Sequence, residues 1–261
     1  MQETRPAAVA GIFYPAEPGE LRQTVERLLQ EAGEPRHTDP KALVVPHAGY
    51  AYSGSLAARA YRGLVDPHRI RRVVILGPAH RVPVLGMALP SVNRFATPLG
   101  EVALDREAME RIRELPEVKT FDAAHAMEHA LEVHLPFLQV LLDDFEIVPL
   151  VVGDTGTSEV VEVLDRLWGG PETLVVVSSD LSHFHPEQEA RALDGATAEA
   201  IEACRSADID TEQACGRVPL RGLLEVARRR GMTVERLGLC NSADAAGPRD
   251  HVVGYGAWSF H

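Results

Sequence analysis

Three histidines follow three short apolar segments of the chain in the same way. Each segment has the length and β-branched content of a buried strand. The pairs are strand 42–45 with His47, strand 72–76 with His80, and strand 173–177 with His183. In an open α/β sheet, ligands bind at the edge where the carboxyl ends of the strands meet. If the three strands are parallel neighbours, we expect the three imidazoles to converge on one site.

A metal site is the chemistry that this pattern indicates, because imidazole is a ligand for zinc, copper, iron and nickel. One histidine after a strand is more simply a hydrogen-bonded loop residue, but three that arrive by one pattern favour a site. Cys215 is the best candidate for a thiolate ligand, since Gly216 lets the backbone approach closely. A site with two or three protein ligands leaves positions open for water or substrate.

The composition is that of an ordinary globular protein, with 261 residues, 45% hydrophobic and 25% charged. The formal net charge of −12 argues against nucleic acid or an anionic membrane surface as the main partner. Cys204, Cys215 and Cys240 form neither a close-spaced zinc pair nor an even disulfide framework. The sequence shows no signal peptide and no membrane-spanning apolar run. We therefore expect a cytoplasmic protein in a reducing compartment.

The alternation of predicted strands and helices favours a single α/β domain over residues 1–261, with a mostly parallel central sheet and helices on both faces. Residues 1–16 are expected to form an extended arm that packs on the body. The expected helices are 17–32, 55–65, 106–115 with Asp105 as N-cap, 158–168, 186–204 and 219–230. The remaining expected strands are 84–89, 146–152, 233–240 and 251–260, with loops at 50–54 and 95–100.

Residues 125–136 carry an unusual density of histidine and glutamate and are expected to be helical, with a kink or a restart at the final proline. Glu128 and Glu132 are four residues apart and would share one helical face. A solvated face with local ion pairs is the expected role of the two, rather than a catalytic carboxylate pair. From the residues alone, His129 is a surface helix residue and His134 a structural one.

Taken together, these segments resemble the Memo family. The resemblance covers nearly the whole chain and is carried by RPAAVAG at 5–11, FYP at 13–15, PHAGY at 46–50, GPAH at 77–80, the segment 128–136, SSD at 178–180 with His183, and CGR at 215–217. In prokaryotes this family is the B component of the AmmeMemoRadiSam group, so the resemblance implies AMMECR-type and radical-SAM proteins as partners. It also implies a fold similar to class III extradiol ring-cleaving dioxygenases, which are non-haem iron enzymes.

The resemblance implies roles for individual residues. His47 and His80 match the two histidines that hold the metal, and His129 and His183 match the acid/base histidines of the dioxygenases. Cys215 falls where the dioxygenases have a glutamate ligand, although the Memo pattern has this cysteine too. One metal ion is implied, iron or copper, with zinc as a further option. A thiolate softens the site towards copper(I) or zinc and is oxidisable beside a redox metal.

Two functions follow as hypotheses. The first is a metalloenzyme with redox or oxygen-dependent chemistry on a small molecule, with His183 as acid/base. Asp180 would then orient His183, although it could equally cap the following helix. The second is a non-catalytic binding or adaptor protein whose cleft holds a metal or a peptide. Retention of both His129 and His183 favours the first, and cysteine in place of glutamate favours the second. A zinc-dependent hydrolase lacks an evident carboxylate base.

Overall fold

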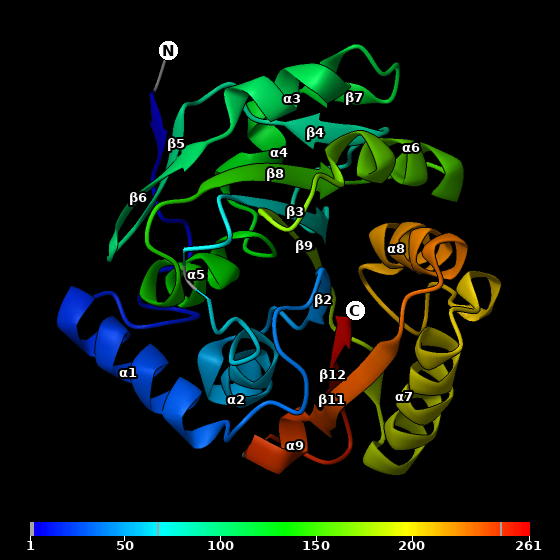
Figure 1. Ribbon diagram of the computed structural model, residues 1–261. Helices are drawn as coiled ribbons and strands as arrows, with labels where there is room; N and C mark the ends of the chain where they lie inside the picture. The colour runs from blue at the N-terminus through cyan, green and yellow to red at the C-terminus, as the bar shows by residue number, and fades with distance from the viewer. Residues whose placement is uncertain (1–2, 67, 246) are drawn as a thin grey trace.

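The computed structural model describes residues 3–66, 68–245 and 247–261 (Figure 1). Its strands are β1 (Thr4–Arg5), β2 (Ala42–Val45), β3 (Arg72–Pro78), β4 (Met87–Leu89), β5 (Arg94–Thr97), β6 (Gly100–Leu104), β7 (Val118–Thr120), β8 (Glu146–Val152), β9 (Thr173–Ser178), β10 (His183–His185), β11 (Val234–Asn241) and β12 (Val252–Phe260). Its α-helices are α1 (Pro18–Glu31), α2 (Tyr50–Tyr61), α3 (Arg106–Arg113), α4 (Asp122–Ala126), α5 (Leu135–Leu141), α6 (Thr157–Leu167), α7 (Glu187–Glu202), α8 (Arg217–Arg230) and α9 (Ser242–Ala245). Two short 3₁₀ turns are η1 (Glu132–His134) and η2 (Ser206–Asp208).

The described strands join into one sheet in the order β1-β5-β6-β8-β3-β9-β2-β12-β10, with β4 paired to β8, β7 to β4 and β11 to β12. The central strands β6, β8, β3, β9 and β2 are parallel to their neighbours in this order, and β12 runs antiparallel to β2. A parallel sheet is covered on both faces, so its strands are continuous apolar runs. The predicted α/β class with a mostly parallel centre is confirmed, although the complete sheet is mixed.

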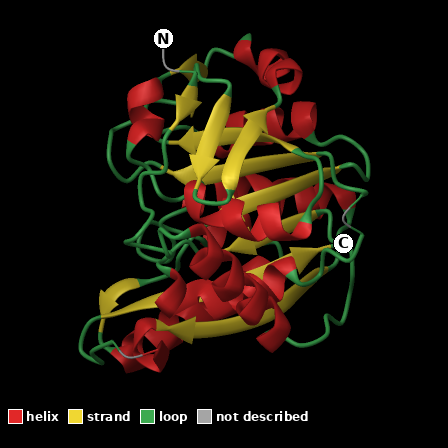
Figure 2. Ribbon diagram, turned by 90° about the vertical axis from the view of Figure 1, so that its left-hand side faces the viewer, coloured by secondary structure: helices red, strands yellow, loops and turns green. Residues whose placement is uncertain are grey.

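Helices cover both faces of the sheet (Figure 1). Helices α1, α2 and α5 lie on one face, and α6, α7 and α8 lie on the other. Figure 2 views the first of these faces and shows the strands fanned from the upper to the lower part of the molecule. The amphipathic helix α1 illustrates the packing, because Leu21, Val25, Leu28 and Leu29 are its buried residues and follow helical spacing.

Two predicted loops are wrong. Residues 50–54 belong to α2, which begins at Tyr50 directly after Gly49. Gly54 lies where α2 packs against α1. A side chain at this position would press on Leu28 of α1, so the glycine allows the two helices to approach closely. The predicted loop 95–100 is largely a hairpin, in which β5 and β6 pair antiparallel. Helix α3 begins as predicted, with the Asp105 carboxylate accepting the Ala108 N–H at 2.8 Å.

The predicted helix over 125–136 is also wrong in its continuity. Helix α4 ends at Ala126, and the chain then turns through residues 127–131 before η1 and α5. Local side-chain hydrogen bonds explain the break, because the Glu128 carboxylate accepts the N–H groups of His129 and Ala130, at 2.9 Å each. A side chain that binds the backbone just after itself competes with helix formation.

The N-terminal segment lies against the body. Strand β1 pairs in parallel with β5, and Val9 and Tyr14 are buried. No helix among the residues described has both the length and the apolar character needed to cross a bilayer.

Candidate metal centre

Strands β2, β9 and β3 lie side by side and parallel, with β9 in the middle. His47 and His80 therefore leave the sheet at one edge and meet there, as the sequence predicted. The predicted convergence of all three imidazoles is wrong for His183, which lies in β10 and is not in the group of mutually close ligand atoms. A fourth histidine, His129, reaches the same place from the turn before α5.

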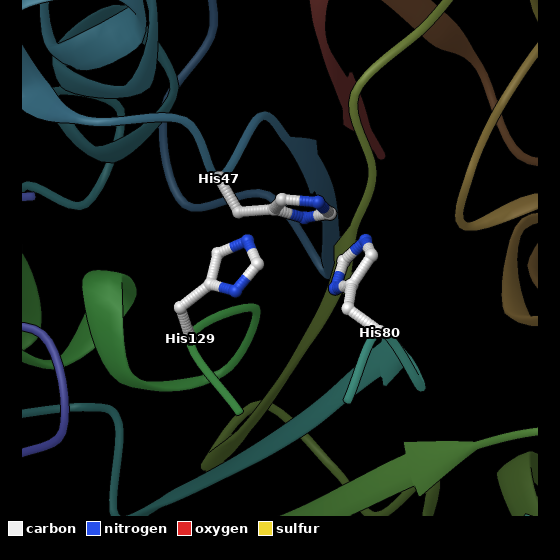
Figure 3. A group of neighbouring side chains, drawn as sticks. All are labelled: His47, His80 and His129. Carbon is white, nitrogen blue, oxygen red and sulfur yellow. The ribbon is translucent and has the colours of Figure 1, made fainter. Parts of the chain in front are cut away.

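The rings of His47, His80 and His129 face one another (Figure 3). One nitrogen from each lies within 4.8 Å of the other two. The centroids of His80 and His129 are 4.6 Å apart and nearly stacked, and His47 meets His80 edge-on at 5.0 Å. Donor nitrogens this close can share one ion after small ring rotations, since each metal–nitrogen bond is about 2.1 Å long.

The tautomer of His47 follows from its hydrogen bonds. The Ser178 hydroxyl donates to the carbonyl of Ala130 at 2.6 Å, so its oxygen must accept from His47 Nδ1, which is also 2.6 Å away. Nδ1 therefore carries the proton, and Nε2 presents its lone pair. Burial and the neighbouring imidazoles hold the pKa of His47 well below its ordinary value. The ring is thus neutral and able to coordinate a metal at physiological pH.

His80 is fixed by the carboxylate of Glu128. That carboxylate accepts the backbone N–H of His80 at 2.7 Å and lies 2.9 Å from Nδ1, which leaves Nε2 free for a ligand. Burial acts to raise the pKa of Glu128, but the His80 and Ala130 hydrogen bonds outweigh it and hold the pKa at about 2. A carboxylate behind a ligand histidine fixes the ring orientation and increases its basicity.

His129 is mostly buried, and its ring lies 4.7 Å from that of Phe13 in the N-terminal segment. Burial lowers the pKa of His129 to about 4, with the nearby His80 adding to the effect. Its Nδ1 is buried with no hydrogen-bond partner among the described residues. The nearest carboxylate oxygen is Glu128 Oε1, 3.3 Å from this Nδ1, so Glu128 lies beside His129 as well as His80.

Of the three clustered histidines, His47 is the one that Cys215 contacts. Its Sγ lies 3.3 Å from His47 Nε2 and accepts the N–H of Asp180, also at 3.3 Å. Burial and the Asp180 carboxyl raise the pKa of this thiol well above its ordinary value. Over the described ranges, no set of three mutually close ligand atoms includes Cys215. The thiol is therefore next to the histidine cluster, and binding a cation would have to release its proton.

The Asp180 carboxyl group contacts both the backbone and the ring of His47. Its Oδ1 accepts the His47 backbone N–H at 2.8 Å, and its Oδ2 lies 3.9 Å from His47 Nε2. Burial raises the pKa of Asp180 to about 7. The two expected roles, orienting His183 and capping the next helix, are both wrong. His183 is instead held by its Nδ1, which donates to the Leu181 carbonyl at 2.8 Å and leaves Nε2 without that proton.

Glu128 and Ser178 fix the rings of His80 and His47, and the sequence predicted this positioning role for neither of them. The expectation that Glu128 and Glu132 lie on a solvated helix face is wrong, because both are buried, at 2% and 0% exposure. Glu128 directly precedes His129 in the sequence. This adjacency of a carboxylate and a histidine was the one sequence signal that could have indicated a positioning role for Glu128. The contact of Glu128 with His80 joins segments 48 residues apart and carries no local pattern.

Gly216 allows the backbone that follows Cys215 to pack closely against the end of β9. A methyl group there would lie 2.5 Å from the Ser178 carbonyl oxygen and 2.7 Å from the Ser179 Cβ. We expect Gly216→Ala to lower the free energy of unfolding by about 2 kcal/mol through overpacking, measured by chemical denaturation. Gly195→Ala in α7 is the matched control, because nothing lies within 4 Å and alanine favours a helix. Equal stability of the two variants would contradict the prediction.

These features define an α/β protein with a histidine-rich candidate metal centre at the carboxyl edge of its parallel strands. The sequence matches the family described as "Memo-like protein" over residues 5–259. A "MEMO1 family protein" of Aquifex aeolicus is 36% identical, covering 96% of this chain and 97% of that protein. One from Saccharolobus islandicus is 34% identical over 97% of this chain and 98% of its own length, and one from Methanobrevibacter smithii is 33% identical over 98% and 99%. The chain belongs to the Memo family.

Proposed function

We propose that this protein binds one metal ion between His47 and His80 and uses it in redox or oxygen-dependent chemistry on a small molecule. The observation that carries the proposal is the convergence of imidazoles whose Nδ1 protons are held by Ser178 and Glu128, so that two Nε2 lone pairs face one centre. A purely structural role would not require two ligand nitrogens to be oriented towards the same point. A bound iron or copper ion would polarise its ligands and exchange electrons with them.

The third ligand is either Cys215 or His129. Cys215 touches His47, and its thiolate would favour copper(I) or zinc over iron. His129 is supported by the short distances from one of its ring nitrogens to a nitrogen of His47 and of His80. If Cys215 is the third ligand, His129 remains available for proton transfer, as the resemblance to dioxygenases implies.

His183 is proposed as the acid/base residue. Its Nδ1 proton is engaged by the Leu181 carbonyl, so Nε2 is the atom able to accept a proton. Burial lowers the pKa of His183, and His80 adds to the effect. The ring is therefore neutral at physiological pH and ready to act as a base towards a substrate held beside the metal.

The test is the metal content of protein purified without oxygen, in the wild type and in the variants Cys215→Ala, His129→Ala and His47→Ala/His80→Ala. His251→Ala, an exposed histidine, is the control. We expect near-stoichiometric metal in the wild type and control, and loss in the double variant. Loss in Cys215→Ala or in His129→Ala identifies the third ligand. Unchanged metal in the double variant, or none in the wild type even after reconstitution, would contradict the proposal.

A binding or adaptor role is the second candidate, and it is favoured by the protonated thiol that stands where the dioxygenases have glutamate. It predicts metal binding without oxygen consumption or substrate turnover. AMMECR-type and radical-SAM proteins are the partners that we propose for such a role, and co-purification of separately tagged proteins tests this assignment.

A further inference from the structure

A hollow adjoins the candidate metal centre at the same edge of the sheet. It has a volume of about 530 Å³ and is lined by Ala79, which precedes His80, and by Cys215. Cavities of roughly 300–1,000 Å³ hold small organic ligands. It opens where β3 and β8 end and where α8 begins, so a molecule seated there would lie against the residues that flank the metal.

The lining combines an apolar wall with one guanidinium group. Val84, Val218 and Pro219 contribute apolar surface, and Arg217 contributes the cationic side chain. Arg217 is partly buried. Its guanidinium makes no ion pair or hydrogen bond with the described part of the chain, whereas many arginines of this protein are paired with carboxylates. A guanidinium binds carboxylate and phosphate groups through two parallel hydrogen bonds.

Asp154, an exposed residue that follows β8, is the one acidic side chain on the lining. No ion pair within 4.0 Å joins it to Arg217, so the arginine is not neutralised from within the hollow. The Asp154 charge would nevertheless repel an anion. Loss of the Arg217 charge is therefore expected to weaken the binding of an anion, and loss of the Asp154 charge to strengthen it.

We propose that this hollow binds a small organic anion with an apolar body, whose charged group pairs with Arg217. The inference rests on the proposed function in one respect, because such an anion is then the class of substrate or effector that the metal centre receives. Binding in the hollow itself does not require the metal, so the two proposals are separable.

The experiment is calorimetric titration of the full-length protein, both zinc-loaded and chelator-treated, with three probes. Benzoate and phenyl phosphate carry the two kinds of anionic group on the same ring, and benzyl alcohol is the neutral match. We expect one anion to bind at least about tenfold more tightly than the alcohol, since a charge-assisted hydrogen bond is worth more than a neutral one. The preferred anion distinguishes a carboxylate ligand from a phosphate ligand.

Variants give the decisive comparison. Arg217→Gln should weaken binding of the preferred anion about tenfold and leave benzyl alcohol unchanged, and Arg217→Lys should retain part of the affinity. Asp154→Asn should strengthen anion binding severalfold, and it provides an independent test if Arg217→Gln does not fold. Anions that bind no better than the alcohol, or equally in the wild type and the soluble variants, would overturn the inference. If chelator-treated protein binds the anion with Arg217 dependence but no form ever binds metal, this inference stands and the metal proposal fails.

Discussion

Glu132→Gln should lower the free energy of unfolding by about 3–5 kcal/mol, because it removes one partner of a buried ion pair. Arg5 Nη1 lies 2.6 Å from Glu132 Oε2, and the two side chains are 5% and 0% exposed. The Ala8 and Val9 N–H groups also donate to this carboxylate, at 2.8 and 3.0 Å, and the Tyr14 hydroxyl donates at 2.5 Å. The glutamine amide would place a donor against donors and leave the Arg5 charge uncompensated.

Denaturant unfolding of the variant measures this effect. Glu162→Gln is the matched control, because its ion pair with Arg166 is an exposed i,i+4 contact on α6, and such pairs contribute only about 0.3–0.5 kcal/mol. If Glu132→Gln were as stable as Glu162→Gln, the carboxylate would not be the anchor of the N-terminal segment.

The same anchor reaches the metal centre. Arg5 also donates to the carbonyls of His125 and Glu128, at 2.7 Å each, and Phe13 of the anchored segment packs on His129. The N-terminal segment is therefore one wall of the site. We expect the arm and the turn 127–131 to loosen together when Glu132 is changed, with an increase in amide exchange in both.

Glu128→Gln should weaken metal binding about 10–100-fold, which is the usual cost of losing the carboxylate behind a ligand histidine. Glu128 receives the N–H groups of His80, His129 and Ala130 and lies 2.9 Å from His80 Nδ1. Glutamine has one accepting oxygen where four donors converge, so the His80 ring loses its fixed orientation and its charge-assisted hydrogen bond.

Competition against a chromophoric chelator gives the dissociation constant for the variant. Glu107→Gln, an exposed side chain on α3, is the control and should bind metal as the wild type does. Equal affinity of Glu128→Gln and the wild type would show that His80 is oriented without its carboxylate. That result would weaken the assignment of His80 as a ligand.

The sequence by itself determined the parts of this protein that depend on local pattern. The apolar runs 42–45, 146–152 and 173–178 are strands because each is buried on both faces, and burial on both faces leaves an uninterrupted hydrophobic signature. Repetition of strand followed by histidine was enough to predict that His47 and His80 meet, although the same pattern wrongly placed His183 in the cluster. The parallel order of β2, β9 and β3 confirms the physical basis of that prediction.

Only the tertiary structure decided what surrounds those histidines. Residues 125–136 have the composition of a helix, but Glu128 and Glu132 each bind donors from distant segments, and these contacts outweigh local helical preference. The proton positions on His47 and His80 are likewise set by Ser178 and Glu128, far away in the chain. A spacing pattern records which residues share a face of one element. The pairing of a buried charge depends on which elements the fold brings together, and no local pattern encodes that choice.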